Sequence, residues 1–65
     1  MKEAILVHLN KCDEPQDVLA IVHFTGLTRL RVEQALIEFQ EVGAVQDSGG
    51  RYRLSEAKRQ EMANA

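Results

Sequence analysis

Two pairs of arginines are the residues of this chain whose type and spacing could do chemistry. Arg29 and Arg31 form one pair, Arg51 and Arg53 form the other, and these four are the only positive charges between residues 13 and 57. A guanidinium group can hold a guanine base through two hydrogen bonds, or it can neutralise a phosphate. We therefore expect a contact with nucleic acid if the fold brings both pairs to the surface.

The two histidines and the single cysteine do not form a catalytic or metal-binding pattern. His8 and His23 fall on different segments, and neither has a cysteine or carboxylate at a recognised zinc spacing. Cys12 ends an apolar stripe, so we interpret it as a small buried hydrophobic side chain and not as a nucleophile. We expect no catalytic residues, no metal site and no cofactor, and hence no enzyme.

Length and composition favour one domain that spans residues 1–65. A single cysteine cannot form an internal disulfide, which fits a reducing compartment and predicts a cytoplasmic location. The longest apolar runs, residues 4–7 and 18–22, are far shorter than the roughly 20 residues that a membrane span needs. We therefore expect neither a signal peptide nor a membrane partner.

The overall charge argues against nucleic-acid binding, whereas the distribution of the charge argues for it. Eight Lys and Arg residues stand against ten Asp and Glu residues, so the net charge is −2. A protein whose affinity comes from phosphate neutralisation is usually basic. The electrostatic field at a binding surface depends on local charge, however, so the positions of the two arginine pairs decide the interpretation.

Two short helices are predicted in the first part of the chain. Residues 2–12 carry apolar side chains at helical spacing, and Pro15 then ends the pattern. Asp17 is a suitable N-cap for a second helix over residues 18–25. The side chains expected to face the core are Ile5, Leu6 and Leu9 in the first helix and Leu19, Ile21 and Val22 in the second.

A third and longer helix is predicted after a tight turn. Gly26 can adopt the positive φ angle that a helix end often needs, and Thr28 can cap the helix that begins at Arg29. This helix should extend over residues 29–41 and stop before Gly43. Its expected core stripe consists of Val32, Ala35, Leu36 and Phe39.

A two-stranded β-hairpin should follow the third helix. Residues 44–47 and 51–54 are separated by Ser48-Gly49-Gly50, which is typical of a hairpin loop. If Tyr52 and Leu54 point inward, the period of two along a strand turns Arg51 and Arg53 outward. Ser55 can then cap a short C-terminal helix from Glu56 to about Met62.

The order of these elements resembles a known architecture. Residues 25–28, the helix 29–41, and the segments 42–45 and 50–57 resemble the core of small winged helix-turn-helix transcription regulators. The resemblance covers nearly the whole chain and identifies a superfamily, not a single family. It implies an α+β fold with a three-helix core, a two-stranded β-hairpin wing and a short C-terminal helix.

The resemblance also implies a site for duplex DNA and a role in transcription regulation. The helix 29–41 would enter the major groove, and the wing would lie beside the phosphates or the minor groove. Gln34 could bind adenine and Leu30 could touch a thymine methyl group, while Glu33 would also point outward. The implied DNA-binding residues are Thr28, Arg29, Leu30, Arg31, Gln34, Arg51 and Arg53.

A second hypothesis remains open, in which the same fold binds a protein partner or a second copy of itself. Leu30, Gln34, Ile37 and Glu41 form a stripe opposite the core face of the third helix, and this stripe is apolar and acidic. Acidic groups repel phosphate, whereas exposed apolar groups fit another protein surface. The further apolar residues expected to lie off the core faces are Val7, Val18 and Phe24.

Overall fold

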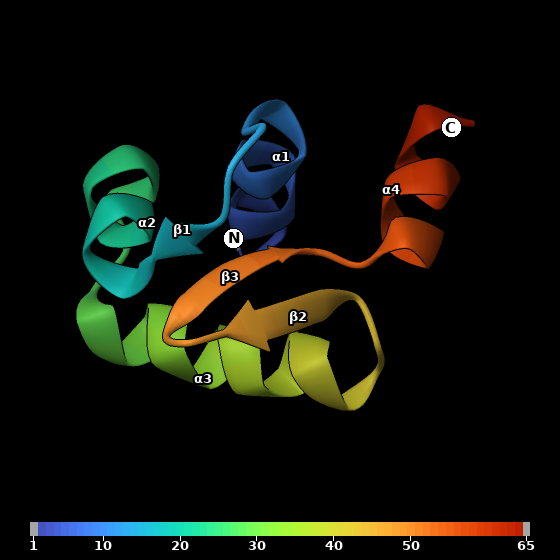
Figure 1. The fold of residues 1–65 in the computed structure, drawn as a ribbon. Helices are drawn as coiled ribbons and strands as arrows, with labels where there is room; N and C mark the ends of the chain where they lie inside the picture. The colour runs from blue at the N-terminus through green and yellow to red at the C-terminus, as the bar shows by residue number, and fades with distance from the viewer. Residues whose placement is uncertain (1, 65) are drawn as a thin grey trace.

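Helices and strands are mixed along the chain in an α+β fold (Figure 1). The structure is a computed structural model that describes residues 2–64, and this part of the chain contains four helices and a three-stranded antiparallel sheet. In chain order the elements are α1 (Glu3–Lys11), β1 (Gln16–Asp17), α2 (Val18–Thr25), α3 (Arg29–Glu41), β2 (Val45–Ser48), β3 (Arg51–Leu54) and α4 (Glu56–Ala63).

The sheet has one strand more than the sequence predicted. The strand order is β1-β3-β2, so β3 lies in the centre, and Gln16 of β1 pairs with Tyr52. On the other side of β3, β2 forms the hairpin: Ser48 pairs with Arg51 next to the loop, and Val45 pairs with Leu54 at the open end. The predicted two-stranded hairpin is therefore present as β2 and β3, but the sequence did not predict the third strand, because a strand of two residues has no periodicity of its own and is defined only by its distant partner.

Side-chain caps start three of the helices, as the sequence predicted. The Asp17 carboxylate accepts a hydrogen bond of 2.8 Å from the Ala20 amide at the start of α2. Thr28 and Ser55 accept corresponding bonds at the starts of α3 and α4. Each cap satisfies an amide that has no partner within its own helix, which confirms these three helix starts.

The turn between α2 and α3 depends on Gly26. Its φ angle is +74°, and its amide donates a hydrogen bond of 2.9 Å to the Val22 carbonyl. The hydroxyl of Thr25 accepts a further bond from the Leu27 amide. The turn therefore needs only residues 26–28 to redirect the chain into α3, and the expected positive φ angle is confirmed.

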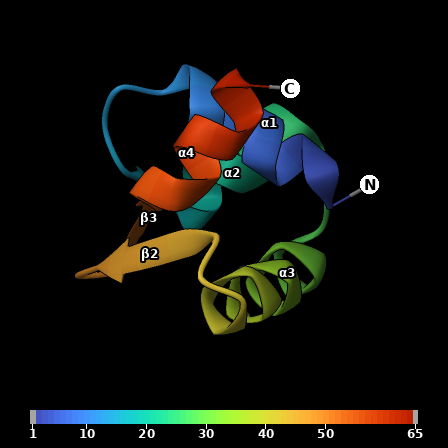
Figure 2. The same cartoon turned by 90° about the vertical axis from the view of Figure 1, so that its right-hand side faces the viewer.

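The core gathers side chains from α1, α2, α3 and the hairpin. Five of its side chains are almost completely buried: Ile5, Leu9, Ile21, Val32 and Leu36. Figure 2 shows α1 and α2 on one side of this core and α3 on the other, with the end of the β2–β3 hairpin standing out from the helices. The hairpin closes the core with Val45 and Leu54.

The core face of α2 differs from the expectation. Leu19 is 65% exposed, whereas Val18 is partly buried against the core. Leu19 and Ile21 are two residues apart, about 200° around a helix, so they cannot share one face. The face follows i, i+3, i+4 and i+7 spacing instead, and it contains Val18, Ile21, Val22 and Thr25.

None of the helices within residues 2–64 is long and apolar enough to cross a lipid bilayer.

Candidate nucleic-acid interface

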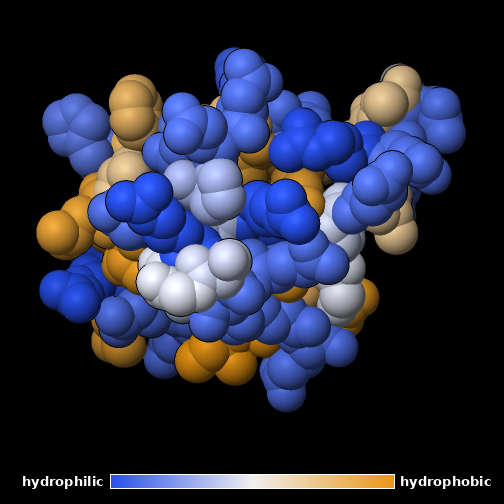
Figure 3. All heavy atoms as spheres, in the orientation of Figure 1, coloured by the Kyte–Doolittle hydropathy of each residue, from blue (hydrophilic) through white to orange (hydrophobic). Residues whose placement is uncertain are grey.

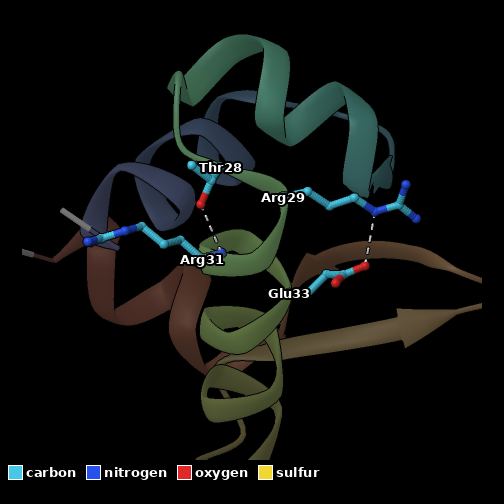
Figure 4. Close-up of polar contacts among 4 residues, drawn as sticks. All are labelled: Thr28, Arg29, Arg31 and Glu33. Carbon is cyan, nitrogen blue, oxygen red and sulfur yellow. Dashed lines mark hydrogen bonds and ion pairs between the residues drawn. The ribbon is translucent and has the colours of Figure 1, made fainter.

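The start of α3 is exposed and is fixed by a cap. The Thr28 hydroxyl accepts a hydrogen bond of 3.3 Å from the Arg31 backbone amide (Figure 4). This bond sets the direction of the first turn of α3, and with it the directions in which Arg29 and Arg31 leave the helix. The positive end of the helix dipole lies here as well, so the first turn favours a negative group.

Arg29 and Arg31 lie on opposite sides of α3. Figure 4 shows the two side chains pointing away from each other, as expected for residues about 200° apart around a helix. The Arg29 Nε atom donates a hydrogen bond of 3.1 Å to Glu33 Oε2, one turn further along. The structure therefore does not bring this arginine pair together, and one member is already paired with a carboxylate.

Arg31 borders a hollow where α3 meets the start of α1. The hollow has a volume of about 290 Å³, and its lining includes Arg31, Gln34 and Glu38. Lys2 Nζ donates a hydrogen bond to Glu38 across it, and this bond raises the pKa of Lys2. Arg31 and Gln34, both predicted site residues, thus lie side by side at one edge of α3.

The outer face of α3 carries exposed apolar side chains. Leu30 is 64% exposed and Ile37 is 57% exposed, with Gln34 and Glu41 also exposed on the same stripe. Figure 3 shows hydrophilic side chains over most of the face that contains the sheet, whereas hydrophobic side chains gather towards the edges formed by α2 and α3. The exposure of this stripe agrees with the sequence prediction.

The two arginines of β3 point outward. Arg51 and Arg53 are exposed, Tyr52 is partly buried and Leu54 is buried, so the predicted alternation is confirmed. Arg51 follows the hairpin loop directly and pairs with Ser48 of β2. The loop is closed by a hydrogen bond of 3.0 Å from the Gly50 amide to the Asp47 carboxylate, which places a negative group near Arg51.

Arg53 lies towards α4, away from the start of α3. It borders a hollow of about 350 Å³ that also includes Asp13, Glu56 and Arg59. Arg59 donates a hydrogen bond of 3.4 Å to the Asn10 carbonyl, 49 residues earlier in the chain. Arg59 was not among the residues predicted from the sequence, and no local pattern could have found it, because it comes close to Arg53 only when α4 folds back towards α1.

The predicted site residues thus form two groups. Within residues 2–64, no hydrogen bond or ion pair joins the group at the start of α3 to the group on β3. In the same part of the chain, the salt bridges leave Arg31, Arg51 and Arg53 without a paired carboxylate. The first group contains Thr28, Arg29, Leu30, Arg31 and Gln34, and the second contains Arg51 and Arg53.

Comparison with family models gives no match for this chain, and comparison with curated proteins gives none either.

Proposed function

We propose that the chain is a winged helix-turn-helix domain that binds duplex DNA. Helix α1, strand β1, helices α2 and α3, and then a hairpin follow one another in the order of such a domain, and the strand order β1-β3-β2 is compatible with this layout. In the proposed complex the start of α3 enters the major groove, and the β2–β3 hairpin lies against the backbone or in the minor groove.

The observation that carries this proposal is the state of the arginines. Arg31, Arg51 and Arg53 are exposed and have no carboxylate partner among residues 2–64, although the chain as a whole is acidic. An exposed guanidinium that is not committed to a carboxylate is free to bind phosphate or guanine. The start of α3 adds the helix dipole to the charge of Arg31.

The proposed roles follow from the position of each side chain. Arg31 and Gln34 share one edge of α3 and read base edges, and Leu30 contacts a thymine methyl group. Arg51, next to the hairpin loop, contacts phosphate. Arg53, which lies further along β3, adds positive charge to the electrostatic field around the wing. A domain of this kind would regulate transcription by occupying a DNA site.

A salt series of binding measurements tests the proposal. Fluorescence anisotropy with a mixed-sequence duplex should show binding that weakens as salt rises, because phosphate contacts release counterions. A preferred DNA site can then be selected from a library of random sequences, and the variants can be compared on that site. Arg31→Ala should cost about 1–3 kcal/mol on that site, and Arg51→Ala should lower the slope of log K against log salt by about 1.

Arg59 provides a matched control for these variants. Its side chain is on α4 and bonds to the Asn10 carbonyl, so Arg59→Ala should leave the affinity for the selected site nearly unchanged. The assignment would be wrong if the parent protein did not bind DNA at low salt. It would also be wrong if Arg31→Ala and Arg53→Ala bound DNA with the same affinity as the parent.

The outer face of α3 supports a second candidate function, binding to another protein. Leu30 and Ile37 are more than half exposed on one stripe, and Val42 at the end of the helix is 77% exposed. An Ile37→Glu variant should then lose the partners or the self-association of the parent, which pull-down and solution-mass measurements would show. If Ile37→Glu keeps the oligomeric state and every partner of the parent, this candidate fails.

A further inference from the structure

The outer stripe of α3 is open to the approach of another helix. Leu30 is 64% exposed and Ile37 is 57% exposed, and the exposed Gln34 lies between them on the same stripe. Figures 1 and 2 both show α3 along the lower edge of the molecule, with the other helices and the sheet above it. A helix that covered the two large apolar side chains would remove them from water, which favours binding.

Charged side chains flank this stripe in a definite order. Arg31 and Glu38 are seven positions apart, about two helical turns, so they lie on the same side of the stripe, and both line the hollow beside Lys2. The opposite side holds Arg29 and Glu33, which neutralise each other in an ion pair of 3.1 Å. One flank therefore carries a positive group near the start of α3 and a negative group two turns later.

This order of charges is complementary to itself when two copies of α3 lie antiparallel. A two-fold axis that passes beside Gln34, perpendicular to the plane of the two helices, brings the same flank of each copy together. Positions 31 and 38 are equally far from the midpoint between positions 34 and 35, so Arg31 of each copy faces Glu38 of the other. The same register places Leu30 within about 3 Å, along the helix axis, of Ile37 in the second copy.

We propose that α3 binds α3 of a second copy of the chain in this antiparallel register, so that Arg31 pairs with Glu38 of the other copy on both sides of the axis. The orientation also sets the positive end of each helix dipole beside the negative end of the other. Lys2 does not prevent the pairing, because its bond uses Glu38 Oε1 and a carboxylate can accept another donor at its second oxygen. A partner surface of a single charge sign would match only half of this flank.

Self-association hides part of the proposed DNA interface. Arg31 and Gln34 lie in the contact between the copies and are also proposed to read base edges, so one α3 cannot serve both partners at once. Two helices of 13 residues bury less than the roughly 1,200–2,000 Å² of a stable interface, so the dimer should dissociate in the micromolar range. Only this competition rests on the proposed DNA binding, and the dimer itself does not.

Sedimentation equilibrium of the full chain tests the dimer over a series of concentrations from micromolar to millimolar. The parent should change from monomer to dimer within the series. Ile37→Glu should remain monomeric, because it places a charge in the apolar contact. Leu19→Glu is the matched control, since Leu19 is 65% exposed on α2 and lies outside the stripe, and this variant should dimerise like the parent.

Charge reversal at positions 31 and 38 tests the register. Arg31→Glu and Glu38→Arg should each weaken the dimer by about tenfold or more, because like charges then face each other across the interface. An equal mixture of the two variants should form a heterodimer, since one chain is then negative at both positions and the other is positive at both. Circular dichroism of each variant should match that of the parent.

Several results would overturn the proposal. These are a parent protein that remains monomeric throughout the series, an Ile37→Glu variant that dimerises like the parent, and a mixture of the two charge variants that does not associate. A monomeric parent that captures a different protein, where Ile37→Glu does not, would assign the stripe to that protein instead of a second copy. These measurements contain no DNA, so their failure is distinct from a failure of the proposed function.

Discussion

The Arg29 Nε atom lies 3.1 Å from the Glu33 carboxylate, one helical turn further along α3. This pair is exposed, so its own contribution to the free energy of unfolding is small. The pair matters for the proposed interface because Glu33 competes with DNA for Arg29. The Arg29 guanidinium must release the Glu33 carboxylate before it can bind a phosphate. Arg31, on the opposite side of α3, has no such competitor among residues 2–64.

Removal of the Glu33 carboxylate should therefore strengthen DNA binding. Glu33→Gln frees the Arg29 side chain and removes one negative charge near the phosphates, so we expect the affinity to rise by about twofold to fivefold at low salt. Fluorescence anisotropy measures this change. Glu61→Gln, which removes the carboxylate paired with Lys58 on α4, is the matched control. An affinity that falls in Glu33→Gln would contradict the proposed orientation of α3.

The Thr28 cap should stabilise the fold measurably. Thr28→Ala removes the hydroxyl that accepts the Arg31 amide, and the free energy of unfolding should fall by about 0.5–2 kcal/mol. Thr28→Ser keeps the acceptor and should stay within about 0.5 kcal/mol of the parent, because serine and threonine are both good caps. Urea unfolding followed by circular dichroism gives both values. Equal losses in the two variants would mean that the cap is not the stabilising feature.

Replacement of Gly26 by a residue with a side chain should lower the stability of the fold, although space for a side chain is available there. A Cβ atom at this position would meet no atom within 4 Å, so the cost of Gly26→Ala comes from the φ angle of +74° and not from a clash. We expect a loss of about 1–2 kcal/mol, and a smaller loss for Gly26→Asn, since asparagine tolerates the left-handed region better. Thermal or urea unfolding distinguishes the two. An alanine variant as stable as the parent would contradict this account of the turn.

Truncation of two adjacent residues of α3 should lower the stability by very different amounts. Leu36 is 1% exposed, so Leu36→Ala should leave a cavity and cost about 2–5 kcal/mol, a large part of the stability of so small a domain. Ile37 is 57% exposed, and Ile37→Ala should change the free energy of unfolding by less than about 0.5 kcal/mol. If unfolding experiments gave similar losses for both, α3 would not pack in the orientation described.

The sequence by itself determined the features that depend on a few neighbouring residues. The caps Asp17, Thr28 and Ser55 act within one turn of their helices, and the positive φ angle of Gly26 is a property of the turn itself. The outward direction of Arg51 and Arg53 follows from the period of two along β3. All of these could be predicted because the interacting groups lie at most a few positions apart.

The spacing of His8 and Cys12 was also visible in the sequence, but the contact between their side chains was not. A separation of four residues allows contact on any helix, and many such pairs do not meet. The stacking of Phe24 on the His8 ring, from a different helix, fixes where the nitrogen atoms lie. The contacts of the His8 ring with Cys12 and Phe24 are therefore a property of the packing between α1 and α2.

Only the tertiary structure decided which distant groups lie together. Strand β1 exists because residues 16–17 pair with Arg51 and Tyr52, and Arg53 lies beside Arg59 because α4 packs near the end of α1. Such contacts depend on the path of the whole chain, which no local pattern records. The same reason explains why the arginine pairs could be predicted to be exposed, whereas the position of Arg53 next to α4 had to be seen in the folded chain.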